Sequence, residues 1–460
     1  MAPREQTAAQ ATMESYFHDV VALLDGLIEA KEVYTATFSA ETSDFVRMNR
    51  GKVRQPGSVA QRYLDIDLIR GARHATYLVA LSGDVHADRT AIASAVAATR
   101  TALSDVADDP HLLLATEVCS TREVRGGALP PAETIIDTVL DAARGTDLVG
   151  LYAGGPVCRG FANSFGQRNW HEATAFNLQW SLYHRADKAV KCALSGFGWD
   201  AGALATKMEA ARADLVHMTR PSKALPPGKY RAYLSPAAME DIASMMCWGG
   251  FSARALATKQ SSLTRMQPGE DPAGNGEGIR LHPSVTIVEA TAEGVAPAFQ
   301  GEGFVRPARV PLIEAGRLTG SLVSPRTERE FGLKANGANG WEAPESLAMA
   351  GGTLAANDAL AALGTGLFVG NLHYLNYSDR PACRLTGMTR FATFWVEGGK
   401  IVAPIDVLRF DDTVFRMLGP NLADLTSETE LMLASDTYGA RQLSSIRVPG
   451  ALISEMTFTL

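Results

Sequence analysis

The sequence predicts an α+β protein with two domains, an N-terminal domain of helices and a largely antiparallel sheet and a β-rich, barrel-like C-terminal domain. Its 460 residues are enough to bury two or three hydrophobic cores. The first half mixes helical periodicity with strands joined by hairpins, which differs from the strict helix–strand alternation of parallel sheets. A stretch rich in proline and glycine, Lys223-Ala-Leu-Pro-Pro-Gly-Lys, then precedes a region of short strands. We therefore expect domains at residues 1–224 and 229–460.

The expected elements of the N-terminal domain follow from two periodicities. Apolar residues at helical spacing predict helices over Met13–Lys31, Thr90–Val106 and Pro131–Arg144. Alternation of apolar and polar residues predicts strands over Tyr63–Leu68 and Phe176–Tyr183. The segment Asn49-Arg50-Gly51 predicts the turn of a short hairpin.

The C-terminal domain is expected to contain two helices among many short strands. The first helix, Pro236–Thr258, is rich in Met and aromatic residues, which suit either a core or an association surface. The second helix is expected around Glu345–Leu363. The expected strands are Tyr230–Leu234, Leu281–Glu289, Val310–Glu314, Phe391–Val396 and Ile401–Leu408. A closed or strongly curled sheet would leave few strand edges exposed, hence the barrel-like prediction.

Composition excludes several classes of protein. The formal net charge is −7, which argues against nucleic-acid binding because that needs clustered Lys and Arg. The sequence contains no run of 18 apolar residues, so it predicts no membrane span. The N-terminus lacks the apolar segment of a secretory signal. Five scattered cysteines without a CxxC pair indicate reduced thiols. We therefore expect a cytoplasmic protein that binds neither nucleic acid nor membrane.

Common catalytic motifs are absent from the sequence. It has no GxSxG, no GxxxxGK[ST] and no HExxH, and its nine histidines show no zinc-ligand spacing. His171-Glu172 is interpreted as a surface pair, and Cys247 as a buried thiol in a Met-rich core.

One polar and aromatic stretch, His373-Tyr-Leu-Asn-Tyr, could bind a ligand because such loops often do. The candidate substrate-binding residues are His373, Asn376, Tyr377 and Arg390, with Cys383 as a further member of any cleft. The alternative is a surface loop with half-buried aromatic side chains.

The second half resembles the TldD/PmbA family, also called modulators of gyrase. The closest motif is Arg390-Phe-Ala-Thr-Phe-Trp-Val-Glu-Gly-Gly-Lys-Ile-Val-Ala-Pro-Ile, which is similar to the family's G-A-x-G-F-W-V-E-x-G-x-I-x-x-P-V hairpin. Other matching segments are Tyr230-Arg-Ala-Tyr-Leu-Ser-Pro, Gly301-Glu-Gly-Phe, Pro311-Leu-Ile-Glu-Ala-Gly-Arg-Leu-Thr-Gly and Ser324-Pro-Arg-Thr-Glu-Arg-Glu-Phe-Gly. Thr393 stands where glycine is typical of the family.

The resemblance implies a subunit without the zinc site. In the catalytic TldD type, a helix carries His-Glu-x-x-x-His and a cysteine near the C-terminus completes the site. Here Ser244 and Gly249 stand at the two histidine positions and Met245 at the glutamate position. The terminal segment Ser435-Asp-Thr-Tyr-Gly offers no cysteine. The chain therefore resembles the TldE/PmbA type, with no cofactor of its own and zinc in a partner subunit.

This resemblance implies an accessory subunit of a heterodimeric TldD/TldE-like zinc metallopeptidase. The complex would act on unfolded or modified peptides, in proteolysis or in peptide or natural-product maturation. Two alternatives remain open: a homodimeric peptide- or ligand-binding protein without catalysis, and a repurposed enzyme with its own cleft.

Overall fold

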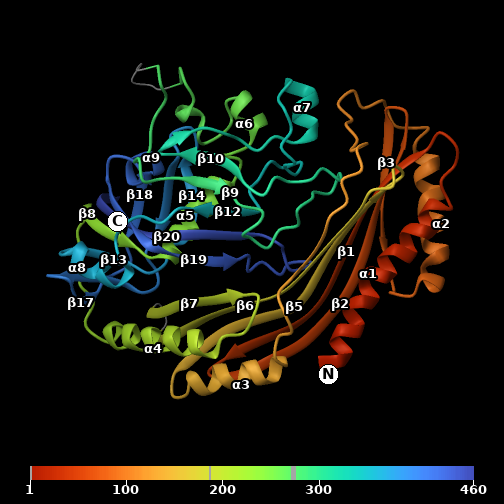
Figure 1. Ribbon diagram of the computed structural model, residues 1–460. Helices are drawn as coiled ribbons and strands as arrows, with labels where there is room; N and C mark the ends of the chain where they lie inside the picture. Colours follow the sequence, from red (N-terminus) through yellow and green to blue (C-terminus); the bar gives the residue numbers. More distant parts are fainter. Residues whose placement is uncertain (1–2, 186–187, 271–275, 460) are drawn as a thin grey trace.

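The computed structural model describes residues 3–185, 188–270 and 276–459, and side chains from residue 13 onward. Two sheets form the molecule (Figure 1), and the predicted α+β class is confirmed. One sheet belongs to the first half of the chain and the other to the second half. The domain boundaries at residues 224 and 229 remain a prediction, although the change from one sheet to the other falls between β7 and β8.

The N-terminal sheet has seven strands in the order β3-β2-β1-β5-β6-β4, with β7 also paired to β6. All pairs are antiparallel except β4 with β6. The strands are β1 Val33–Asn49, β2 Lys52–Arg70, β3 Arg73–Ala80, β4 Arg122–Arg125, β5 Asp147–Asn163, β6 Arg168–Arg185 and β7 Lys188–Gly196. The helices are α1 Pro3–Asp25, α2 Val85–Ala102, α3 Ala132–Ala142 and α4 Ala201–Met218.

The long strands of this sheet serve two cores. Near α1 and α2, the core includes Phe17, Phe38 and Ile66. Near α3 and α4, it includes Trp180 and Met208 together with Phe394 from the second half of the chain. Figure 1 shows the two helix pairs at opposite ends of β1, β2 and β5. The predicted turn at Arg50-Gly51 is confirmed, but β1 and β2 are far longer than a short hairpin. Strand β1 reaches both cores, and β2 pairs with it along its whole length although its first half is exposed.

The C-terminal sheet has thirteen strands, and its main path runs β11-β10-β9-β12-β20-β8-β13-β16-β17. The strands are β8 Gly228–Leu234, β9 Ile287–Glu289, β10 Val310–Glu314, β11 Arg317–Leu318, β12 Ser346–Met349, β13 Gly366–Val369, β14 His373–Asp379, β15 Arg384–Met388, β16 Thr393–Glu397, β17 Lys400–Pro404, β18 Arg409–Thr413, β19 Leu422–Leu433 and β20 Ser445–Phe458. The helical elements are α5 Pro236–Cys247, α6 Ala253–Ala257, η1 Thr264–Met266, α7 Pro325–Phe331, η2 Ala356–Asp358, α8 Ala359–Leu363 and α9 Val414–Met417.

Within the described residues this sheet stays open, so the barrel-like prediction was wrong in that detail. The backbone groups along the edge strand β17 find hydrogen-bond partners outside the sheet. Arg220 Nη1 donates to the carbonyl oxygens of Ile401 and Val402 at 3.0 and 3.1 Å. Lys223, in the proline-rich stretch, forms a bridge with Ile405 beyond the end of the same strand. The side chain of Arg220 and the backbone of Lys223 therefore satisfy polar groups along an edge that closure would otherwise have paired.

Two predicted helices differ from the structure. The helix expected over Pro236–Thr258 is two helices, α5 and α6, because Gly249 has φ +72° and turns the chain after Cys247. The helix expected around Glu345–Leu363 is strand β12 followed by η2 and α8. Pairing of β12 with β9 and β20 outweighs the local helical pattern there.

Helix α5 is fixed by its first turn and by its buried face. Ser235 Oγ accepts from Ala238 N, and Pro236 occupies the first turn. Met239, Ile242 and Met246 are buried in the core of the second half. The Met-rich face is therefore core rather than a surface available for association.

Candidate functional site

The candidate site follows α5 and the neighbouring strand β14. The backbone N of Leu372, just before β14, donates to Asp241 Oδ2 at 3.1 Å. Further along both elements, Tyr377 Oη donates to the Met245 carbonyl oxygen at 2.6 Å. The two elements thus run side by side in the same direction, and a different group of side chains lies at each end.

At the first end lies a group of ionisable side chains, here called the charged cluster. Its members are Lys191 of β7, Glu240 and Asp241 of α5, His373 of β14 and Arg390 of the β15–β16 loop. Arg390 Nη1 lies 3.1 Å from His373 Nε2, and the Lys191 ammonium lies 5.7 Å from the centre of the Phe391 ring. The cluster therefore joins both sheets at the first end of α5.

Burial dominates the electrostatics of the charged cluster. It raises the pKa of Asp241 to about 7, with the neighbouring Glu240 carboxylate adding to the shift. Burial also raises the pKa of Glu240, whose Oε1 accepts from Ser244 Oγ at 3.2 Å. The pKa of His373 is lowered by burial and by Arg390 and Lys191. Among the described residues, no member of the cluster forms an ion pair within 4.0 Å.

At the second end of α5, the side chain of Arg380 packs against the aromatic rings of Tyr377 and Trp248. The Arg380 guanidinium lies 5.2 Å from the Tyr377 ring centre and 5.7 Å from that of Trp248. Arg380 also donates to the carbonyl oxygens of Trp248 and Gln260, at 2.6 and 3.3 Å. The Trp248 side chain remains 60% exposed. This arrangement is here called the arginine plug.

The arginine plug lies beside Gly249, the residue that the family resemblance assigns to the second histidine of the zinc motif. Of the residues at the three motif positions, Ser244 is half-buried on α5 and Met245 is buried, while Gly249 lies beyond the last residue of the helix. A Cβ atom at Gly249 would lie 2.8 Å from Arg380 Nη2. Serine, methionine and glycine offer no imidazole or carboxylate, and a guanidinium beside them repels a cation. These residues do not fit a zinc ion.

Three of the four predicted substrate-binding residues belong to the two groups described above. His373 and Arg390 meet in the charged cluster, whereas Tyr377 belongs to the arginine plug. Asn376 is exposed and its Oδ1 accepts from the backbone N of Tyr377 at 2.8 Å. The stretch expected as a loop is strand β14, paired with β15. Cys383 is fully buried near Tyr377, and burial raises its pKa to about 12, so it is a packing residue.

Sequence reasoning missed Lys191, Asp241 and Arg380. Burial raises the pKa values of both Glu240 and Asp241. His171 was also misread as a surface residue. It is fully buried, its ring nitrogens lie 3.2 Å from Glu123 Oε2 and 3.1 Å from the Val295 carbonyl oxygen, and burial lowers its pKa to about 4.

Within residues 3–185, 188–270 and 276–459, no group of three or more His, Cys, Asp or Glu side chains is placed to hold a metal ion. None of the helices in these ranges is long and apolar enough to cross a membrane.

Solved structures similar to this chain share its fold over nearly the whole length. TldE from Thermococcus kodakarensis has a TM-score of 0.76 at 12% identity, covering 97% of this chain and 100% of that chain. A proposed modulator of DNA gyrase from Thermotoga maritima has a TM-score of 0.72 at 13% identity, with the same coverage. Another, from Bacteroides thetaiotaomicron, has a TM-score of 0.70 at 15% identity, covering 100% of this chain and 99% of that chain.

A search of curated protein sequences gives no match. Residues 227–460, which include α5, β14 and the arginine plug, match the family described as the PmbA/TldA metallopeptidase C-terminal domain. The chain therefore belongs to the PmbA/TldD family.

Proposed function

We propose that this chain is the non-metal accessory subunit of a heterodimeric TldD/TldE-like zinc metallopeptidase. The observation that carries the proposal is the set of residues at the three motif positions near the second end of α5, none of which can bind zinc. The helix is retained with its cap and core, but Ser244, Met245 and Gly249 replace the motif residues and Arg380 fills the adjacent space. Zinc and the general base would come from a partner subunit that carries His-Glu-x-x-x-His.

The charged cluster suits the holding of a peptide substrate. Lys191 and Arg390 can receive carboxylates, while Glu240 and Asp241 can receive amino groups or backbone N–H donors. An accessory subunit that lacks a metal can contribute to turnover in this way, by orienting an unfolded or modified peptide. Whether the product serves protein degradation or peptide maturation depends on the partner and its substrates.

The experiment that tests this proposal is co-expression with an HExxxH relative encoded in the same genome. The purified mixture is expected to form a stable complex and to cleave unfolded peptides, and a chelator should abolish the cleavage. Replacing the partner's motif glutamate by glutamine provides the matched control. Chelator-sensitive cleavage by the isolated chain would refute the accessory role.

A second candidate is a homodimeric ligand-binding protein or an enzyme that uses the charged cluster itself. Asp241 favours this alternative, because a carboxyl with a pKa of about 7 is matched to proton transfer near neutral pH. Absence of an HExxxH relative from the genome, together with peptide binding by the chain alone, would favour it.

We also propose a reducing, cytoplasmic location. All five cysteines are free, and Cys158, Cys192 and Cys383 lie in packed surroundings where burial raises their pKa values. A reductant is therefore expected to leave the melting temperature unchanged.

A further inference from the structure

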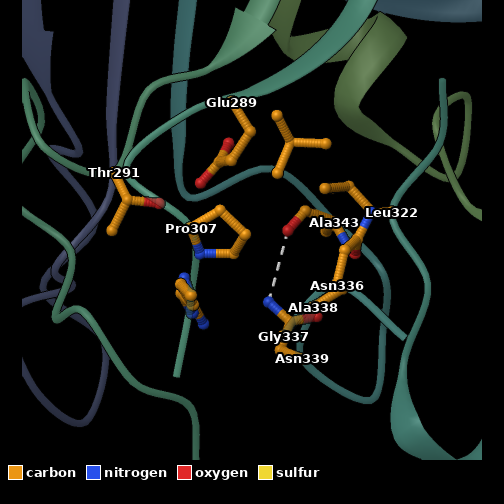
Figure 2. Close-up of a pocket in the computed structure, with 11 residues that line it drawn as sticks. Glu289, Thr291, Pro307, Leu322, Asn336, Gly337, Ala338, Asn339 and Ala343 are labelled. Atoms are coloured by element: carbon orange, nitrogen blue, oxygen red, sulfur yellow. Dashed lines mark hydrogen bonds between the residues drawn. The ribbon is translucent and has the colours of Figure 1, made fainter. Parts of the chain in front are cut away.

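The cavity drawn in Figure 2 is too small to hold a solute. The Glu289 carboxylate and the Thr291 hydroxyl point into it, but its volume is about 10 Å³, which is space for about one water molecule. The surface of the N-terminal sheet offers more, because strand β2 has a neighbour on only one side over its first half, among the residues that the structure describes.

Strand β2 pairs with β1 along its whole length, but it pairs with β3 only from Tyr63 to Arg70. Figure 1 shows β3 at the end of the sheet where α1 and α2 lie. Residues Lys52–Gln61 are therefore here called the free edge, since no strand of the described part of the chain lies beyond them. Every residue of Lys52–Ala60 is exposed. An edge of this length can accept a further strand.

One hydrogen bond shows which backbone groups of the free edge face outward. The Arg62 carbonyl oxygen accepts from Leu81 N at 2.9 Å, on the side away from β1. Because a strand repeats every two residues, Ala60, Ser58 and Pro56 also turn their backbone groups outward. Pro56 has no N–H to donate, so an added strand forms few backbone hydrogen bonds. Binding along this edge must therefore draw on a further interaction.

The turn of the β1–β2 hairpin supplies positive charge next to the free edge. Four exposed cations lie within residues 47–54, here called the basic end, and they are Arg47, Arg50, Lys52 and Arg54. None of these side chains forms a hydrogen bond or an ion pair with a described residue. Residues 43–61 hold these four cations and one carboxylate, Asp44, although the net charge of the chain is −7. The basic end therefore attracts negative charge.

We propose that the free edge and the basic end together bind an extended, acidic peptide segment. The segment adds as a strand beside Ser58 and Ala60, and its carboxylates lie against the basic end. Because both faces of β2 are exposed here, the added strand meets no side-chain pocket, so binding tolerates many sequences. Unfolded segments rich in Asp and Glu have this chemistry. The surface is separate from the charged cluster and the arginine plug.

A second copy of this chain fits the free edge less well. Two-fold pairing about Ser58 would place Pro56 of each copy opposite Ala60 of the other and would bring Arg54 near Arg62. Each proline would leave a carbonyl oxygen without its donor, and the arginines would repel each other. The charge of the edge therefore favours an acidic segment.

Fluorescence anisotropy with the full chain tests this surface. The probe is a labelled peptide of sequence Glu-Val-Thr-Glu-Val-Thr-Glu with blocked termini. A second peptide has Lys in place of each Glu, and a third keeps Glu but carries N-methyl groups on its central Thr-Glu-Val, which removes the donors of a strand. The acidic peptide should bind the wild type at least about tenfold more tightly than either of the others.

Two variants separate the contributions of charge and edge. Lys52→Glu with Arg54→Glu reverses two charges of the basic end, and Ala60→Pro removes an outward N–H without breaking the pairing with β1. Each should weaken binding by about tenfold or more. The matched control is Arg89→Glu with Lys334→Glu, which makes the same change in net charge at two other exposed cations and should bind like the wild type. Melting temperatures show that each variant is folded.

The proposal fails if the acidic peptide does not bind at about 1 mM, or if the lysine peptide or the N-methylated peptide binds the wild type as tightly. Displacement of the peptide by duplex DNA at equal phosphate concentration would assign the basic end to nucleic acid. A dimer of the chain that Ala60→Pro converts to a monomer would assign the edge to a second copy, and either result would overturn the proposal. These measurements need neither peptidase activity nor a partner subunit, so they are independent of the accessory role.

Discussion

The two ends of helix α5 differ in how fully the charged side chains there are bonded within the protein. At the first end, the charged cluster gathers ionisable groups without ion pairs among the described residues. At the second end, Arg380 satisfies two carbonyl oxygens and lies against two aromatic rings. The end that would carry metal chemistry is therefore closed by protein groups, and the other end keeps groups that can receive a ligand. The proposed accessory role rests on this difference between the two ends of α5.

The largest expected effect comes from the buried face that both ends share. Ile242→Ala should lower the free energy of unfolding by about 3 kcal/mol, because the side chain is fully buried. Ser244→Ala, on the half-buried side of the same helix, should cost about 0.5 kcal/mol or less. Chemical denaturation of both variants measures the contrast. Equal losses would mean that the Ser244 side is also a packed core.

The two arginines provide the sharpest contrast between the ends. Arg380→Ala should cost about 2 kcal/mol of stability, since it removes two charge-assisted hydrogen bonds to carbonyl oxygens. Arg390→Ala removes only a contact with His373 and should cost about 0.5 kcal/mol or less. Thermal and urea unfolding of the two variants measures the loss of stability in each. If Arg390→Ala destabilised the protein more than Arg380→Ala, the assignment of a closed and an open end would be reversed.

Asp241 predicts a pH dependence of stability that belongs to the first end. Its pKa is raised to about 7 in the folded chain, so the folded state favours the protonated carboxyl. The stability that it contributes is complete below its ordinary pKa of 3.8 and is lost as the pH rises through about 7. Asp241→Asn should therefore be more stable than the wild type at pH 8 by about 1–2 kcal/mol, with little difference at pH 4. Urea unfolding at both pH values measures it, and Asp137→Asn, an exposed change on α3, is the control.

The smallest effect concerns the fit of Arg380 against Gly249. Gly249→Ala and Gly332→Ala both place a side chain at similar positive φ, +72° and +69°, and each should cost about 1 kcal/mol. Only at Gly249 would the new Cβ meet another group, Arg380 Nη2 at 2.8 Å; nothing lies within 4 Å at Gly332. Gly249→Ala should cost a few tenths of a kcal/mol more, and the excess should vanish in an Arg380→Ala background. An excess that persists there would show that Arg380 does not fill this space.

Local patterns predicted much of the fold. Leu64, Ile66 and Leu68 alternate with polar residues and are all fully buried, because the period of a strand is a property of neighbouring residues. The cap at Ser235 was predictable for the same reason. Strand β12 and the full lengths of β1 and β2 were not, because pairing with distant strands decides them.

The candidate site was only partly predictable. His373 and Arg390 stood out as polar residues near the family hairpin, and they do meet. Lys191 and Asp241 join them from elements that are far apart in sequence, and no local pattern predicts that meeting. His171 shows the same limit, since the chain around Val295 and Glu123 buries a residue that resembles a surface one.

Zinc content is the most direct test of the central claim, that the second end of α5 no longer holds a metal. The chain would be expressed alone in zinc-supplemented medium, dialysed against buffer with a weak chelator and assayed for metal by mass spectrometry. The account predicts less than about 0.1 zinc ion per chain, because Ser244, Met245 and Gly249 offer no ligands and Arg380 lies beside them. About one tightly held zinc ion per chain would contradict it.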